Sequence, residues 1–143
     1  MWSTFVSINA YFSLKSGINC LTFYIPIHAQ SKRNGTIYYF AGSHELGFLE
    51  HEPKGNIGAS MCLKKTNKLK KLFNYGIKYI SLKPGDVVIH NALVVHGTLP
   101  NPLGNSCEAF NFTFFGENNK LNQKEYKIYK DKLKLFLEEK NNF

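Results

Sequence analysis

The segment that decides the fold runs Lys83-Pro-Gly-Asp-Val-Val-Ile-His90-Asn-Ala-Leu-Val-Val-His96-Gly-Thr-Leu-Pro-Asn101. Its Pro-Gly-Asp step is typical of a tight turn, and the apolar runs at 87–89 and 93–95 are typical of buried strands. A sheet would hold His96 rigidly, as a metal or substrate ligand requires. A lone histidine is also common as a hydrogen-bonded core residue, so both roles stay open at this point.

A second motif lies upstream and runs Asn34-Gly-Thr-Ile-Tyr-Tyr-Phe-Ala-Gly-Ser-His44-Glu-Leu-Gly47. Asn-Gly-Thr, Gly-Ser-His, Gly-Asp and His-Gly-Thr-x-x-Asn, in this order, resemble the C-terminal two-thirds of the phytanoyl-CoA dioxygenase family over about residues 3–115. The resemblance implies a mainly β fold, the double-stranded β-helix or jelly roll, with about seven strands and here a C-terminal α-helix. It also implies Fe(II) and 2-oxoglutarate as cofactors.

The family's iron motif is degenerate in this chain. That family holds iron with two histidines and a carboxylate. The resemblance places Ser7 at the first histidine and Asn9 at the aspartate, so that only His96 is retained. The loss can also be seen without an alignment, because no histidine of the sequence is followed two positions later by Asp or Glu. The residues at those positions are Gln30, Leu46, Pro53, Ala92 and Thr98.

The cosubstrate position is altered as well. The family grips the 2-oxoglutarate carboxylate with an arginine, and here Cys107 stands at that position, with Thr98 at the supporting hydroxyl. The sole arginine, Arg33, lies elsewhere. We therefore expect weak binding of both cofactors. Further candidate pocket residues are Tyr11, Asn91, Asn111, His44 and His51.

His90 shares strand parity with His96, which predicts that both face the same side of a regular strand. Six residues of extended chain span roughly 20 Å, too far for a common metal ion. A two-histidine site would need the chain to turn at Asn91-Ala92.

The 143 residues predict a single domain. We expect a β core over 1–116, a long excursion at 45–76 with a short helix near its end, and a C-terminal helix over 121–140. In the family, helices that precede the iron motif cover the face on which Phe110, Phe112 and Phe114 are expected to lie. The candidate cover here is the apolar stripe of the C-terminal helix; if it is insufficient, the exposed surface would favour a homo-oligomer.

The net charge of +8 comes from lysines that cluster in two segments, without the interleaved aromatic pattern of a nucleic-acid binder. Three unpaired cysteines indicate neither a disulfide framework nor a zinc site. The sequence shows no signal peptide or membrane span, so we expect a cytoplasmic protein that acts on a small molecule, with no nucleic-acid or membrane partner.

Three hypotheses follow from these observations. The favoured one is a truncated or degenerate family member that acts as a small-molecule or protein binding module. The second is an active 2-oxoglutarate-dependent hydroxylase with a non-standard metal site. The third is a cupin-like metal-binding protein, although His44-Glu45 and Glu50-His51-Glu52 have the wrong spacing for a cupin motif.

Overall fold

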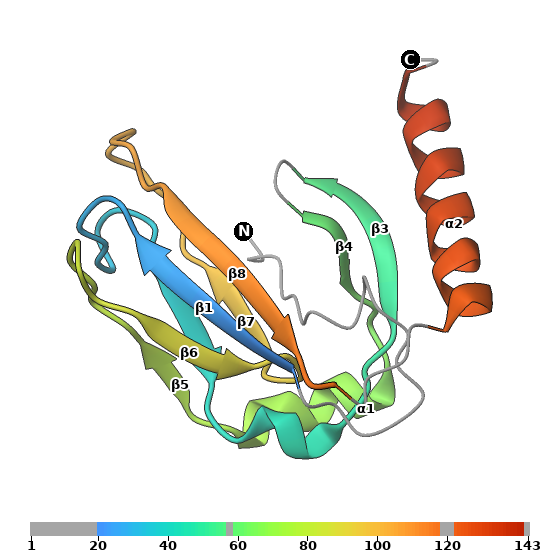
Figure 1. Ribbon diagram of the computed structural model, residues 1–143, viewed down its shortest axis with the longest axis horizontal. Coiled ribbons are helices and arrows are strands. Elements are labelled where there is room, and N and C mark those ends of the chain that lie inside the picture. The colour runs from blue at the N-terminus through green and yellow to red at the C-terminus, as the bar shows by residue number, and fades with distance from the viewer. Residues whose placement is uncertain (1–19, 57–58, 118–121, 142–143) are drawn as a thin grey trace.

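The computed structural model describes residues 20–56, 59–117 and 122–141. Eight strands occur in these residues, and six of them form two facing antiparallel sheets (Figure 1). The predicted mainly β fold is confirmed. One sheet has the order β6 (Val88–Asn91), β1 (Cys20–Pro26) and β8 (Ala109–Phe115). The other has the order β5 (Ile77–Tyr79), β2 (Ile37–Phe40) and β7 (His96–Thr98).

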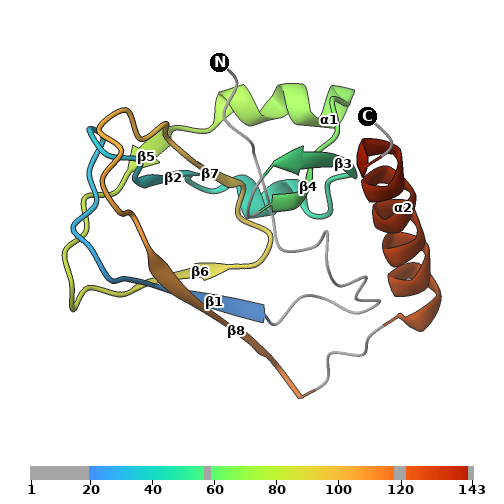
Figure 2. The same cartoon turned by 90° about the horizontal axis from the view of Figure 1, so that it is seen from above.

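The two sheets stack as separate layers when the molecule is seen from above (Figure 2). Strand β1 alternates as its sequence predicts, with Cys20, Thr22 and Tyr24 buried and Leu21 exposed on the opposite side. Between the sheets, Tyr24 packs with Ile37, Tyr39 and Leu82 in a hydrophobic cluster. The space between the sheets is therefore lined by aromatic and polar side chains together.

The expected long excursion is present and covers the outer face of the second sheet. It contains the 3-10 turn η2 (Ser43–Leu46), a hairpin of β3 (His51–Asn56) and β4 (Ala59–Leu63), helix α1 (Asn67–Lys70) and the 3-10 turn η3 (Lys71–Asn74). The helical turns agree with the short helix that the sequence predicts, whereas the hairpin was not predicted. Its leucines form a second core with side chains of the sheet: Tyr38, Phe40, Leu49, Leu63, Leu72 and Val95.

Strand β2 is consequently buried on both faces. All four of its residues are buried, because Ile37 and Tyr39 face the first sheet while Tyr38 and Phe40 face the excursion. A continuous apolar run is the pattern that such a strand requires.

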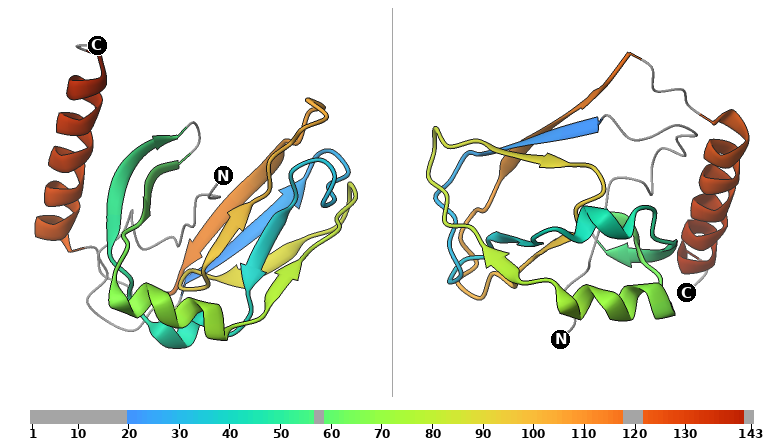
Figure 3. Two further views of the ribbon diagram at one scale, coloured as in Figure 1. Left: turned by 180° about the vertical axis from the view of Figure 1, so that it is seen from behind. Right: turned by 90° about the horizontal axis from the view of Figure 1, so that it is seen from below.

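The outer face of the first sheet is apolar and exposed. The exposed apolar side chains of this face come from all three strands. They include Ile89 of β6 (54% accessible), Leu21 of β1 (45%), and Phe110 (57%) and Phe114 (60%) of β8. Helix α2 (Gln123–Asn141), the expected C-terminal helix, lies beside β3 (Figure 3). The interpretation of this helix as a cover for the phenylalanine face was wrong, because α2 lies beside β3 and Phe110, Phe112 and Phe114 stay exposed.

Candidate functional site

His90 and His96 lie side by side because the chain turns sharply between them. Strand β6 ends at Asn91, whose side-chain Oδ1 accepts a hydrogen bond from the Leu93 N–H at 2.8 Å. The Val94 N–H donates to the Asn91 carbonyl at 3.1 Å, which closes the turn. The chain thereby crosses from the first sheet to the second, and the two imidazole centroids end 4.9 Å apart. The turn that a two-histidine site would need is present.

Tyr39 joins the two histidines from the neighbouring strand. It is the register partner of His96 on β2, and their ring centroids are 5.7 Å apart. Its hydroxyl lies 3.0 Å from Nδ1 of His90, in a buried hydrogen bond. Tyr39 was not among the predicted site residues, since β2 lacks the alternation that would distinguish its two faces. Its place in the family motif before Gly-Ser-His was the available signal.

These three side chains are neutral at pH 7. Burial, and to a lesser extent the nearby His96, lowers the pKa of His90 to about 3. Burial also lowers the pKa of His96, an effect partly opposed by its hydrogen bond to the Val94 carbonyl. Burial raises the pKa of Tyr39, so the phenol keeps its proton.

A second set of neutral groups continues from Tyr39 towards the loops. The Tyr24 hydroxyl donates to Oε1 of the buried Gln30 at 2.7 Å. Burial raises the pKa of Tyr24; the hydrogen bond to Gln30 opposes this effect, and Cys107 adds to it. Burial raises the pKa of Cys107 as well, so the thiol favours its protonated form, and its Sγ lies 3.8 Å from the Gly35 carbonyl.

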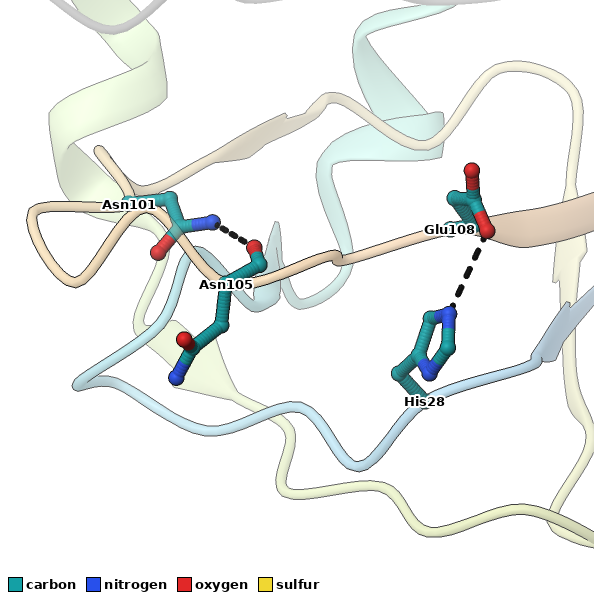
Figure 4. Close-up of polar contacts among 4 residues, drawn as sticks. All are labelled: His28, Asn101, Asn105 and Glu108. Carbon is teal, nitrogen blue, oxygen red and sulfur yellow. Dashed lines mark hydrogen bonds and ion pairs between the residues drawn. The ribbon is translucent and has the colours of Figure 1, made fainter.

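The loop that carries Cys107 is tied to the end of β1 (Figure 4). His28 Nε2 lies 3.2 Å from the Glu108 carboxylate, and the Asn101 side-chain amide donates to the Asn105 carbonyl at 2.5 Å. The Ile27 N–H also donates to the Glu108 carbonyl at 2.9 Å. These contacts give the Cys107 position a fixed place relative to Tyr24.

The remaining predicted site residues are dispersed. Thr98 is exposed at the end of β7, opposite Ile37, and Asn111 is exposed on β8, opposite Tyr24. Asn91 shapes the turn between the histidines through its side chain. Ser7, Asn9 and Tyr11 lie outside the described residues.

The two loop histidines belong to the excursion on the outer side of the second sheet. His44 is exposed in η2, whereas His51 is half-buried on β3 with its Nδ1 2.8 Å from the Leu49 carbonyl. The Val95 N–H donates to Ser43 Oγ, and the Val95 side chain packs in the second core with Tyr38 and Phe40. This core separates the excursion with its two histidines from the His96 ring.

The sequence matches one known protein family over most of its length. Residues 4–102 match the family model for phytanoyl-CoA dioxygenase. The chain belongs to the phytanoyl-CoA dioxygenase family. No curated protein sequence gives a significant match.

Solved structures of oxygenases share the fold and confirm the predicted jelly roll. EctD from S. alaskensis, solved with 2-oxoglutarate and 5-hydroxyectoine, superposes with a TM-score of 0.64 at 16% identity over 84% of this chain and 40% of that chain. The alpha-ketoglutarate-dependent carbocyclase SnoK gives 0.66 at 16% identity over 88% and 49% of the two chains. EvdO2 from Micromonospora carbonacea var. aurantiaca gives 0.60 at 16% identity over 82% and 49%. This chain therefore spans less than half the length of these structures.

The described residues of this phytanoyl-CoA dioxygenase family member do not fit a three-ligand iron site. Within ranges 20–56, 59–117 and 122–141, no three His, Cys, Asp or Glu side chains group as metal ligands. The six strands of the facing sheets contain no Asp or Glu, and their only lysine or arginine is the exposed Lys78. His96 thus lacks a neighbouring carboxylate in this part of the chain.

Proposed function

We propose that this family member binds a small molecule between its two sheets and has lost iron-dependent turnover. One observation carries the proposal: the groups that surround His96 in the described residues are uncharged donors and acceptors. Divalent iron is held by anionic and imidazole ligands together, and neutral phenol and thiol groups are poor substitutes. The family fold supports a role in binding a small molecule. The uncharged side chains near His96 favour a ligand other than Fe(II) and 2-oxoglutarate.

The residues at the altered positions point in the same direction. Ser7 and Asn9 would remove one imidazole and the negative charge from the ligand set, according to the family pattern. Cys107 would replace a guanidinium that forms two parallel hydrogen bonds to a carboxylate. Its thiol, whose pKa burial raises, carries no positive charge. Loss of the metal site and loss of the cosubstrate site would then have occurred together.

A non-standard metal site is the second candidate, since the His90 and His96 rings are 4.9 Å apart. Two imidazoles can contribute to a transition-metal site. For His90 Nε2 to bind a metal, the ring proton would have to lie on Nδ1, and the hydrogen bond with the Tyr39 hydroxyl would then run from Nδ1 to the phenol oxygen. We rank this candidate second because no third ligand accompanies the pair in the described residues.

The test is a comparison of succinate release by the original chain and repaired variants. We expect no 2-oxoglutarate-dependent succinate from the original chain in the presence of Fe(II). Ser7→His with Asn9→Asp should restore iron binding, and turnover should require Cys107→Arg in addition. The Ser7→His, Asn9→Asp double variant, which keeps Cys107, is the matched control. Steady succinate production by the original chain would contradict the proposal and favour the second candidate.

A further inference from the structure

His90 carries a buried polar atom that the protein leaves unsatisfied. The residue is only 8% exposed, and its Nε2 has no hydrogen-bond partner among the described residues. A buried polar group without a partner is costly and uncommon, so its surroundings indicate what it binds. Nδ1 of the same ring is occupied by Tyr39, and Nε2 faces away from that contact.

The protonation of His96 follows from its backbone partner. Its Nδ1 lies 3.0 Å from the Val94 carbonyl oxygen, which can only accept a hydrogen bond. Nδ1 therefore carries the proton in the neutral ring. The lone pair of His96 is consequently on Nε2, where it can accept a hydrogen bond.

The protonation of His90 follows from counting partners. The Tyr39 hydroxyl has His90 Nδ1 as its one described partner. If the hydroxyl donates, His90 carries its proton on Nε2 and a single buried group is left unpaired. If His90 Nδ1 donated instead, both the hydroxyl proton and the Nε2 lone pair would lack a partner. The first arrangement is favoured because it leaves fewer unpaired groups.

The two rings, whose centroids are 4.9 Å apart, thus carry one free donor and one free acceptor. We propose that His90 and His96 form a subsite for the hydroxyl group of an uncharged, largely apolar alcohol. His90 Nε2–H donates to the hydroxyl oxygen, and the hydroxyl proton is donated to His96 Nε2. This inference rests on the proposed small-molecule function and adds the chemical class of the ligand.

The surroundings of the pair favour an alcohol over a carboxylate. The lone pair on His96 Nε2 repels a carboxylate oxygen, and neither β6 nor β7 carries a lysine or arginine that would offset that charge. The adjacent cluster of Tyr39 and Leu82, with Val88 and Val94 packed against it, makes the surroundings of the pair apolar, which suits the carbon skeleton of an alcohol better than a charged group.

The first test measures the tautomers in the full chain at pH 7. Two-bond ¹⁵N–¹H correlation spectra should show the His90 proton on Nε2 and the His96 proton on Nδ1. A His90 proton on Nδ1 would overturn the proposal. The tautomers are read from the original chain, and substitutions serve only to assign the signals of the two rings. The measurement does not depend on iron or succinate.

The second test uses cyclohexanol and cyclohexanecarboxylate as probes of matched size. Cyclohexanol should shift the His90 and His96 ring signals saturably, whereas the carboxylate should not. His90→Gln keeps a donor near the Nε2 position and should bind cyclohexanol within about threefold of the original chain. His90→Asn loses that donor and should bind it at least about tenfold more weakly.

The control for this titration is His44→Gln, a substitution of an exposed histidine in η2 on the outer side of the second sheet. It should leave cyclohexanol binding unchanged. Preference for the carboxylate, or equal weakening by Gln and Asn at position 90, would overturn the alcohol subsite. Absence of any shift by cyclohexanol would do so as well, because water alone would then satisfy His90 Nε2. None of these outcomes alters the iron and succinate result, so the two proposals fail independently.

Discussion

At the scale of single residues, the site depends on a hydrogen bond that joins the two sheets. Tyr39 belongs to the second sheet and His90 to the first, and their contact at 3.0 Å is buried. The register of β2 with β7 places Tyr39 opposite His96. One phenol therefore sets the orientation of one histidine and packs near the other.

Removing this phenol hydroxyl should destabilise the protein measurably. Tyr39→Phe leaves the buried His90 Nδ1 without its donor, which should lower the free energy of unfolding by about 1–3 kcal/mol. Tyr79→Phe is the matched control, because Tyr79 is 41% exposed and keeps its ring contacts as phenylalanine. Its effect should stay within about 0.5 kcal/mol. Urea unfolding measures both; equal effects would show that the Tyr39 hydrogen bond contributes nothing.

The lowered pKa of His90 predicts a loss of stability on acidification. Between the unfolded pKa of about 6.5 and the folded pKa of about 3, the unfolded chain binds a proton that the folded chain does not. The free energy of unfolding should therefore fall as pH falls through this window, by at most about 1.4 kcal/mol per pH unit from this residue. His90→Gln should reduce the slope between pH 7 and pH 5. Parallel curves for the two proteins would contradict the assignment.

At the scale of elements, the two sheets differ in what covers them. The excursion packs on the outer face of β5-β2-β7, whereas the outer face of β6-β1-β8 is exposed in the structure. Phe40 and Phe112 are the same residue type on these two outer faces, and they are 2% and 49% exposed. Their contributions to stability should differ accordingly.

Alanine substitution at these two positions tests the difference. Phe40→Ala should cost about 3–5 kcal/mol of unfolding free energy, because it removes a ring from a packed core. Phe112→Ala should cost less than about 2 kcal/mol, since the ring is already half accessible to water. Both values come from chemical unfolding under identical conditions. A larger cost at Phe112 would mean that another part of the protein covers this face.

The sequence predicted elements whose pattern is local and missed those that depend on tertiary context. The alternation of β1 and the Gly-Asp turn agree with the structure. The two apolar runs predicted as buried strands agree only in part: 88–91 forms β6 with Ile89 exposed, and 93–95 lies in the turn before β7. The β3–β4 hairpin escaped prediction because 45–76 shows no clear periodicity. The proximity of His90 and His96 depended on whether the chain turned at Asn91, which strand parity alone could not decide. Tyr39 was hidden in a strand buried on both faces.

At the scale of the whole molecule, the chain retains the two-sheet body of its family. It spans 40% of the EctD chain and 49% of the SnoK chain. Within the part of the chain that the structure describes, no helix has both the length and the apolar character needed to cross a membrane. Self-association through the exposed phenylalanine face remains a prediction.

The most direct test of the account is the amount of Fe(II) that the purified chain binds under anaerobic conditions. We predict well below one iron per chain after equilibration and desalting, because the groups near His96 in the described residues include no carboxylate. The Ser7→His, Asn9→Asp variant should approach one iron per chain under the same conditions. One tightly bound iron per original chain would contradict the account and identify the protein as an iron enzyme with a ligand set of its own.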